Sequence, residues 1–363
     1  MARRLQSDKI LLGTVVGLTL FGALMVFSAS AVMATERFRS GHYFLIRQLA
    51  WAGLGFAVLV VLMYVDYRWL ASPKVVFPAL AAQWILLTLV LFANRTHNTR
   101  RWLHLGPASL QPSELSKIVV VLFLAYFLAQ RSGAVNHLKH TLLPVGLISV
   151  VTIALVVKEP DFGTALAIAM IVAAMLFTAG VRLRYLAAMG TVGLAGAAWL
   201  ALGSAYRHNR LLAFLNPYSD PLGKGFQIIQ SFIAVGTGGI TGMGLMEGKQ
   251  KLFYLPEPQN DFIFSVVSEE LGFIGAVLLI AAFAVILWRG WRASEGCTSE
   301  FGRLLAVGLT VMLVGQALVN ISVVLGLLPT KGIPLPLISY GGSSLVVTLA
   351  AVGILLNISQ DVA

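Results

Sequence analysis

Residues 10–33 are ILLGTVVGLTLFGALMVFSASAVM, an apolar run without a charged residue. A helix of about 20 residues crosses a hydrocarbon core of about 30 Å, so this run is long enough to span a membrane. It is too long for the core of a cleavable signal peptide, and no clear small-residue cleavage site with a soluble domain follows it. We therefore interpret it as the first transmembrane helix.

Similar apolar runs recur along the whole chain. Of its 363 residues 58% are hydrophobic and only 11% are charged, whereas soluble domains carry roughly 25% charged residues. The runs are continuous, which excludes the short alternating segments of a membrane β-barrel. The fold class we predict is an all-α polytopic membrane protein with ten transmembrane helices, at residues 10–33, 49–65, 75–93, 115–128, 142–157, 164–181, 186–202, 271–288, 304–328 and 345–358.

The predicted topology is a single membrane domain, residues 1–363, with both termini on one side because the number of spans is even. The basic residues Arg3, Arg4 and Lys9 precede the first span and favour a cytoplasmic N-terminus at residues 1–9. A large periplasmic loop at about residues 203–270 then joins helices 7 and 8, and a cytoplasmic C-terminus begins at about residue 359. A single cysteine excludes a disulfide framework and any multi-cysteine metal site.

The segment RRWLHLGPASLQPSELSK, residues 100–117, leads into the fourth predicted span. Pro112 fits the first turn of a helix and Ser113 is placed to cap it. Glu114 and Lys117 are three residues apart and share one helix face. They form either a charge pair that holds a polar cavity open at the mouth of the bundle or a surface pair worth a few tenths of a kcal/mol.

Acidic residues also mark two external loops. In KEPDFGTA, residues 158–165, either Asp161 caps the next helix, or Glu159 or Asp161 helps to coordinate a divalent cation. In the long loop, Asp261 either caps the eighth helix or acts chemically. Glu269 and Glu270 are costly against lipid, so at least one of them is expected to point into the bundle or to water.

The segment PTKGIPLPLISYGGSSL, residues 329–345, precedes the last span. Pro334 and Pro336 prevent a regular helix, and the glycines that follow allow close approach of a neighbour or ligand. Hydroxyls such as that of Ser343 and the backbone amides of a helix start suit an anionic group. Helix capping is the alternative interpretation.

Four segments together resemble the SEDS family, typified by FtsW and RodA: SASAVMA, QPSELSK, LPEPQNDFIFSVVSEELG and PTKGIPLPLISYGGSS. They follow one another in the family's order over almost the whole chain. The wording PTKG and ISYGGSS is more similar to the FtsW branch, because the residues that correspond to Thr330 and Lys331 usually differ in the RodA branch.

The resemblance implies a peptidoglycan glycosyltransferase that polymerises lipid II into β-1,4 glycan at the outer face of the bacterial cytoplasmic (inner) membrane, for septal wall synthesis in division. It also implies a class B penicillin-binding protein transpeptidase as partner, with other divisome or elongasome membrane proteins, and no nucleic acid. The family's essential aspartate matches Asp261, and its acidic and basic pair matches Glu114 and Lys117. The family often has Gln where this chain has Glu159.

The implied reaction is a single inverting displacement with release of undecaprenyl pyrophosphate. Our hypothesis assigns Asp261 as general base, or as the residue that orients the acceptor or a metal. Lys117, Arg101 and Lys331 would stabilise the departing pyrophosphate, and Ser343 would support substrate binding. A divalent cation, Mg²⁺ or Mn²⁺, would assist, with Asp261, Glu114 and Asp161 as candidate ligands and no organic cofactor.

Two alternative functions stay open at this stage. A lipid II flippase would also need a lipid-sized groove and external charges, but it would tolerate Asn in place of Asp261. A non-catalytic scaffold of the division complex would tolerate charge-neutral changes at both Asp261 and Lys117. The sequence has no convincing internal repeat and no paired interrupted spans, which argues against an alternating-access transporter.

Overall fold

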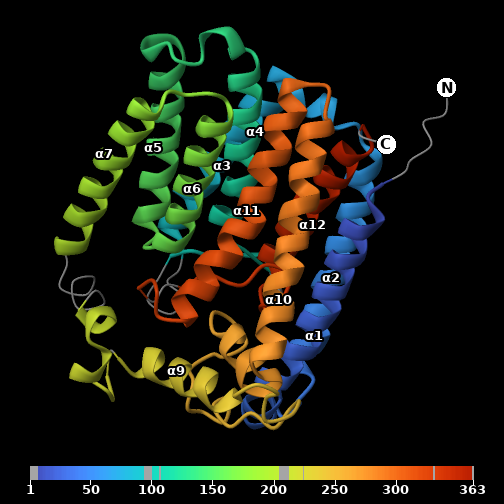
Figure 1. Ribbon diagram of the computed structural model, residues 1–363, viewed down its shortest axis with the longest axis vertical. Helices are drawn as coiled ribbons and strands as arrows, with labels where there is room; N and C mark the ends of the chain where they lie inside the picture. Colours follow the sequence, from blue (N-terminus) through green and yellow to red (C-terminus); the bar gives the residue numbers. More distant parts are fainter. Residues whose placement is uncertain are drawn as a thin grey trace.

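A computed structural model describes residues 7–93, 100–105, 108–203, 212–223, 225–329 and 332–361 as a bundle of long helices (Figure 1). The helices are α1 (Lys9–Phe38), α2 (Tyr43–Tyr64), α3 (Pro73–Phe92), α4 (Pro112–Ala129), α5 (Leu143–Lys158), α6 (Phe162–Thr178), α7 (Leu183–Leu202), α9 (Phe226–Gly238), α10 (Ile263–Gly296), α11 (Glu300–Val324) and α12 (Gly342–Ser359). A two-stranded antiparallel hairpin, β1 (Leu103–Leu105) and β2 (Ala108–Leu110), precedes α4, and single turns of 3₁₀ or π-helix lie at Tyr67–Ala71, Ser132–Ala134, Leu138–Leu142 and Pro217–Ser219.

The predicted helical membrane fold is confirmed. Each predicted span overlaps one helix, and eight helices of the described residues are long and apolar enough to cross a membrane: α1 to α5, α10, α11 and α12. Helix α6 is apolar but shorter, with 17 residues. The number of ten membrane crossings therefore stays a prediction. Helix α2 begins at Tyr43 rather than at residue 49, because the polar residues Arg47 and Gln48 continue the helix beyond its apolar run.

The centre of the bundle is built from α4, α11 and α12. In these helices 78%, 83% and 78% of the most apolar window is buried inside the protein, against 22% in α2 and 28% in α3. Small residues permit the closest approaches: a Cβ atom at Gly353 of α12 would lie 2.6 Å from the carbonyl oxygen of Leu59 in α2. Close backbone contact through small residues is a common way for helices to pack in membranes.

Helix α10 is broken at Gly272, which has a φ of +65°. The loop that follows α9 pairs with the break: the Met243 N–H donates to the carbonyl of Glu269 at 3.0 Å, and the Phe273 N–H donates to the carbonyl of Gly239 at 2.9 Å. The continuous eighth helix expected over 271–288 is thus wrong at its start. The glycine frees backbone groups in the helix and the loop satisfies them, as a break in an apolar bundle requires.

A buried polar cluster fixes the same loop to the bundle. Lys251 pairs with Glu270 at 2.6 Å and donates to the Ser28 hydroxyl of α1 at 3.0 Å. The Ser28 hydroxyl lies 2.6 and 2.8 Å from the two Glu270 oxygens. Glu269, also buried, accepts hydrogen bonds from backbone N–H groups of the loop. The expectation that at least one of these glutamates points inward is confirmed, and we call Ser28, Lys251 and Glu270 the Lys251 cluster.

Substitution of Lys251 by Ala is expected to destabilise the protein strongly. It leaves the Glu270 carboxylate buried without its cation, which typically costs about 3–5 kcal/mol. The melting temperature of the purified protein in detergent measures the effect. Lys249→Ala is the matched control, because this side chain is exposed and only its backbone N–H contacts Glu269. Equal melting temperatures for the two variants would contradict the role of the cluster.

Candidate functional site

A cavity of about 2890 Å³ connects a groove between α5, α6 and α7 with the loops at the end of the bundle opposite the termini (Figure 1). Its groove is apolar, with Ile153, Leu166 and Met189 among its lining residues. Its loop end carries the polar side chains, including Asp261 and Glu114. The cavity therefore combines a wall for a hydrocarbon chain with a polar chamber.

Asp261 lies in the turn before α10 and borders the polar chamber. Phe262 is the N-cap residue of α10 and the helix begins at Ile263, so the alternative that Asp261 caps this helix is wrong. Its carbonyl accepts a hydrogen bond from the Asn320 side chain of α11 at 2.8 Å. A Cβ atom at Gly332 would lie 2.8 Å from the Asp261 Oδ2 atom. The glycine thus lets the loop before α12 pass beside this carboxylate.

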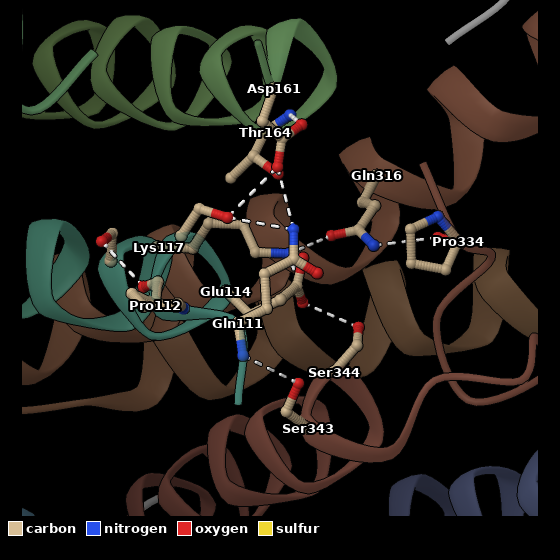
Figure 2. Close-up of polar contacts among 12 residues, drawn as sticks. Gln111, Pro112, Glu114, Lys117, Asp161, Thr164, Gln316, Pro334, Ser343 and Ser344 are labelled. Atoms are coloured by element: carbon tan, nitrogen blue, oxygen red, sulfur yellow. Dashed lines mark hydrogen bonds and ion pairs between the residues drawn. The ribbon is translucent and has the colours of Figure 1, made fainter. Parts of the chain in front are cut away.

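Glu114 and Lys117 form a buried ion pair, with side chains 2% and 3% exposed and a separation of 2.9 Å (Figure 2). The shared helix face is confirmed, and the alternative of a surface pair is wrong. The Lys117 ammonium also donates to the Gln316 side chain of α11 at 2.5 Å, and the Ser344 hydroxyl of α12 donates to Glu114 at 2.7 Å. Glu114 borders the cavity, whereas Lys117 lies behind it.

Two residues of this network, Gln316 and Asn320, were missed by the sequence analysis. Gln316 donates to the carbonyl of Pro334 at 2.9 Å, and Asn320 donates to the carbonyl of Ile333 at 2.7 Å. They are four apart on α11 and therefore share a face. Two amides on one face of an otherwise apolar span were the available signal, because polar residues inside membrane helices are costly and usually point into the bundle.

Asp161 acts as the cap of α6, as one of the two interpretations predicted. Its carboxylate accepts hydrogen bonds from the Thr164 N–H at 3.1 Å, the Thr164 hydroxyl at 2.8 Å, the Gln111 side chain at 2.9 Å and the Ser113 hydroxyl at 3.1 Å (Figure 2). The expected capping of α4 by Ser113 is wrong, because Gln111 is the N-cap residue of α4 and the Ser113 hydroxyl is used by Asp161.

The other candidate residues occupy different places around the cavity. Arg101 borders it and holds the α5–α6 turn, since its guanidinium donates to the carbonyls of Glu159, at 3.1 Å, and of Pro160. The Ser343 hydroxyl accepts a hydrogen bond from the Gln111 N–H at 3.3 Å at the start of α12. Lys331 lies outside the described residues.

The three candidate metal ligands are not gathered into one site. Among the described residues no group of three or more His, Cys, Asp or Glu side chains is placed to hold a metal ion. The carboxylate oxygens of Glu114 and Asp161 accept hydrogen bonds from other side chains and backbone groups of the protein. Asp261 borders the polar chamber of the cavity. One carboxylate fits Mg²⁺ that is held chiefly by the phosphates of a substrate, which is how this ion is commonly bound.

Glu159, the residue after α5, is fully buried, and within the described chain neither of its carboxylate oxygens has a hydrogen-bond partner. The pKa of Glu159 is raised to about 9, chiefly by burial and next by the nearby Asp161 charge, while Arg101 opposes the shift. The side chain is therefore neutral near pH 7. A neutral acid resembles glutamine in shape and polarity. This agrees with the family resemblance, in which Gln often stands at the position of Glu159.

Substitution of Glu159 by Gln is expected to remove a pH dependence of stability. The folded-state pKa of about 9 lies above the ordinary pKa of 4.5 for a glutamate, so the folded protein keeps a proton that the unfolded chain releases between these pH values. Stability of the wild type therefore falls as pH rises through this window. The melting temperature of the variant, relative to wild type, should rise from about pH 5 to about pH 9. A constant difference would contradict a raised pKa.

Comparisons with known proteins agree with this architecture over the full chain. A family model described as cell cycle protein, which carries the names FtsW, RodA and SpoVE, matches residues 8–363. A probable peptidoglycan glycosyltransferase FtsW from Geobacter sulfurreducens (strain DL-1 / KN400) is 47% identical over 355 residues, 97% of this chain and 95% of that protein. Stage V sporulation protein E from Bacillus subtilis (strain 168) is 41% identical over 362 residues, 99% and 98% of the two chains.

Two solved structures have the same fold. One, from a study of the structural coordination of polymerization and crosslinking by a peptidoglycan synthase complex, has a TM-score of 0.81 at 34% identity and covers 98% of each chain. The rod shape determining protein RodA of Thermus thermophilus has a TM-score of 0.74 at 30% identity and covers 99% of this chain and 98% of its own. The resemblance carried by the four sequence segments is confirmed, and the chain belongs to the SEDS family of FtsW, RodA and SpoVE, in its FtsW branch.

Proposed function

We propose that this chain is a peptidoglycan glycosyltransferase that polymerises lipid II for the septal cell wall. The names of its full-length relatives support this activity. The observation that carries it is a carboxylate, Asp261, in the polar chamber of a cavity whose other end is an apolar groove. A lipid-linked sugar requires this combination, because its hydrocarbon chain stays in the membrane plane while its sugar reaches a catalytic group.

The reaction is an inverting displacement at the donor sugar. The 4-hydroxyl oxygen of the acceptor bonds to C1 of the donor from the face opposite the diphosphate, the C1–O bond to the diphosphate breaks, and Asp261 accepts the hydroxyl proton. General bases of this kind contribute typically 10²- to 10⁴-fold. The product is the β-linkage, and the leaving group is undecaprenyl diphosphate.

Arg101 and Lys158 are the cations best placed to receive the leaving diphosphate, since both border the cavity beside the apolar groove. Lys117 has a different part in this proposal. Its ammonium is enclosed by Glu114 and Gln316, so it positions the chamber wall and contributes little free charge. Cations aimed at developing charge in a site of low dielectric are worth more than the same charges in water.

A divalent cation fits this scheme as a companion of the substrate. Mg²⁺ or Mn²⁺ bound to the diphosphate would neutralise charge on the leaving group. In the protein, Asp261 is the residue that would hold it from the chamber side. In this proposal Glu114 and Asp161 have structural parts instead, because hydrogen bonds within the protein occupy their carboxylates.

The membrane frame of this proposal has ten crossings with both termini in the cytoplasm and the loop at about 203–270 in the periplasm. The start of α1 and the end of α12 lie at the end of the bundle opposite α9, and the turn before α10 lies at the α9 end (Figure 1). The basic residues before α1 favour a cytoplasmic position for that end. Synthesis at the outer face of the cytoplasmic membrane follows.

The proposed partner is a class B penicillin-binding protein, the transpeptidase that crosslinks new strands. A solved relative comes from a peptidoglycan synthase complex in which polymerization and crosslinking are coordinated. The described residues of this chain are a membrane bundle with connecting loops, so crosslinking would have to come from another protein. Other membrane proteins of the division or elongation machinery would bind the same assembly.

Substitution of Asp261 by Asn is expected to abolish polymerisation of labelled lipid II while leaving the fold intact. The amide keeps the shape of the side chain but cannot accept the proton. Gel separation of products from the purified protein, with and without its transpeptidase, measures glycan length. Asp220→Asn is the matched control, because this aspartate is exposed on the same long loop and does not border the cavity.

The outcomes of this experiment separate the alternatives. A wild-type glycan ladder that is lost only in Asp261→Asn supports the polymerase. A ladder of equal strength in both variants would contradict the base role. The absence of any ladder under all partner conditions, together with lipid II transfer across proteoliposomes, would favour the flippase, and the absence of both activities would favour the scaffold.

Removal of divalent cations is expected to reduce the polymerisation rate and to leave protein stability unchanged. The ion would be held mainly by substrate phosphates, and the described residues offer no multidentate cage. The rate with EDTA, and after addition of Mg²⁺ or Mn²⁺ in excess, tests the first part. The melting temperature without substrate tests whether stability is unchanged. A large fall of the melting temperature on chelation would contradict an ion that is held mainly by the substrate.

A further inference from the structure

A second basic end of the cavity lies at the hairpin between α1 and α2. Arg37, Tyr43, Arg47 and Tyr340 line this end, and the reaction described above does not use them. Both arginine side chains are exposed to the cavity or its opening. Within the described chain neither guanidinium has a carboxylate at ion-pair distance, whereas five other cations do. Among the residues that the structure describes, no ion pair therefore neutralises the positive charge of these two arginines.

Aromatic contacts hold Arg47 in place. Its guanidinium lies 4.7 Å from the centre of the Tyr43 ring and interacts with the Tyr340 hydroxyl. The Tyr340 ring in turn packs edge-on against Phe44 at 5.0 Å. A guanidinium stacked on an aromatic ring keeps its planar N–H groups ordered, which favours bidentate recognition of phosphate.

The second basic end is joined directly to the Asp261 turn. The Tyr340 N–H donates to the carbonyl of Gln259 at 2.9 Å, two residues before Asp261. Gln48, next to Arg47, donates from its side chain to the carbonyl of Ser339 at 3.3 Å. The catalytic turn, the loop before α12 and the start of α2 thus form one connected wall of the chamber.

The two basic ends lie on opposite sides of the bundle. Arg101 and Lys158 stand beside the groove of α5, α6 and α7, whereas Arg37 and Arg47 belong to α1 and α2, on the other side of the central helices (Figure 1). Asp261 and Glu114 border the same continuous cavity. Arg37 lies near the end of α1 and Arg47 near the start of α2.

We propose that Arg37 and Arg47, with Tyr340, bind the diphosphate of the acceptor, the second polyprenyl-linked substrate. This inference rests on the proposed polymerase function, because polymerisation joins two lipid-linked sugars and each carries its own diphosphate. The donor loses its diphosphate at the Arg101 end. The acceptor keeps its diphosphate throughout and needs only to be held, so that its sugar reaches Asp261 from the opposite side.

The kinetic test compares Arg47→Gln with Arg39→Gln. Arg39 is exposed on the same hairpin and does not border the cavity, which makes it a matched control. Initial polymerisation rates are measured against lipid II concentration in nanodiscs. We expect Arg47→Gln to raise the KM for lipid II by about 10-fold or more, as for loss of a charge-assisted hydrogen bond, with kcat reduced far less. Arg39→Gln should match wild type.

A binding test needs no turnover. In the Asp261→Asn background we expect two equivalents of labelled lipid II per protein in nanodiscs, and one equivalent after addition of Arg47→Gln. If both variants bind one equivalent of lipid II and the wild type makes glycan, the proposed acceptor site is wrong but the proposed polymerase function is not. Failure of the wild type to make glycan would instead overturn the proposed function.

A phospholipid headgroup is the other source of the same chemistry. Nanodiscs of purely zwitterionic lipid and nanodiscs with added anionic lipid separate the two. If Arg47 binds the acceptor, Arg47→Gln should raise the KM for lipid II in both kinds of nanodisc. A defect that appears only with anionic lipid would overturn the proposal, since Arg47 would then anchor the protein to the membrane surface.

Discussion

A lysine ammonium enclosed by apolar helices must find acceptors, and Lys117 finds them in Glu114 and Gln316. The arrangement of the segments around the polar chamber depends on this interaction. Because Ser344 donates to Glu114 and Gln316 donates to Pro334, the pair fixes the positions of α4, α11, α12 and the loop before α12 (Figure 2). A buried pair of this kind is weak support for stability, since apolar replacements are often equally stable. Its consequence here is one fixed arrangement of four segments.

The Lys251 cluster fixes the position of the long loop, as the Glu114–Lys117 pair fixes the wall of the chamber. It joins the loop to α1 and α10, and the break at Gly272 adds backbone pairing to the same loop. Asp261 follows this fixed stretch and is held from α11 by Asn320. A carboxylate on a loop can thus be positioned almost as firmly as one on a helix, provided that buried polar contacts secure the loop on both sides.

The sequence predicted the helices better than it predicted the contacts between them. Continuous apolar runs identify the spans because lipid imposes one solution on the backbone. The spacing of Glu114 and Lys117 predicts their shared face because helix geometry is local. Pairings such as Lys251 with Glu270, or Tyr340 with Gln259, join segments far apart in the chain and depend on tertiary packing. Ser113 shows the limit most clearly, since its local capping signal was overridden by the distant Asp161.

The two basic ends of the cavity bear on how two membrane-bound molecules could reach one polar chamber. In the proposed polymerase, both substrates are confined to the membrane plane by their hydrocarbon chains, so they would approach Asp261 only from the side. A single entrance would force two bulky headgroups to pass one another. An apolar groove along α5 to α7 with cations at its mouth, and a second set of cations at the α1–α2 hairpin, allow approach from opposite sides. In that proposal, Asp261 would act only at the point where the two sugars meet.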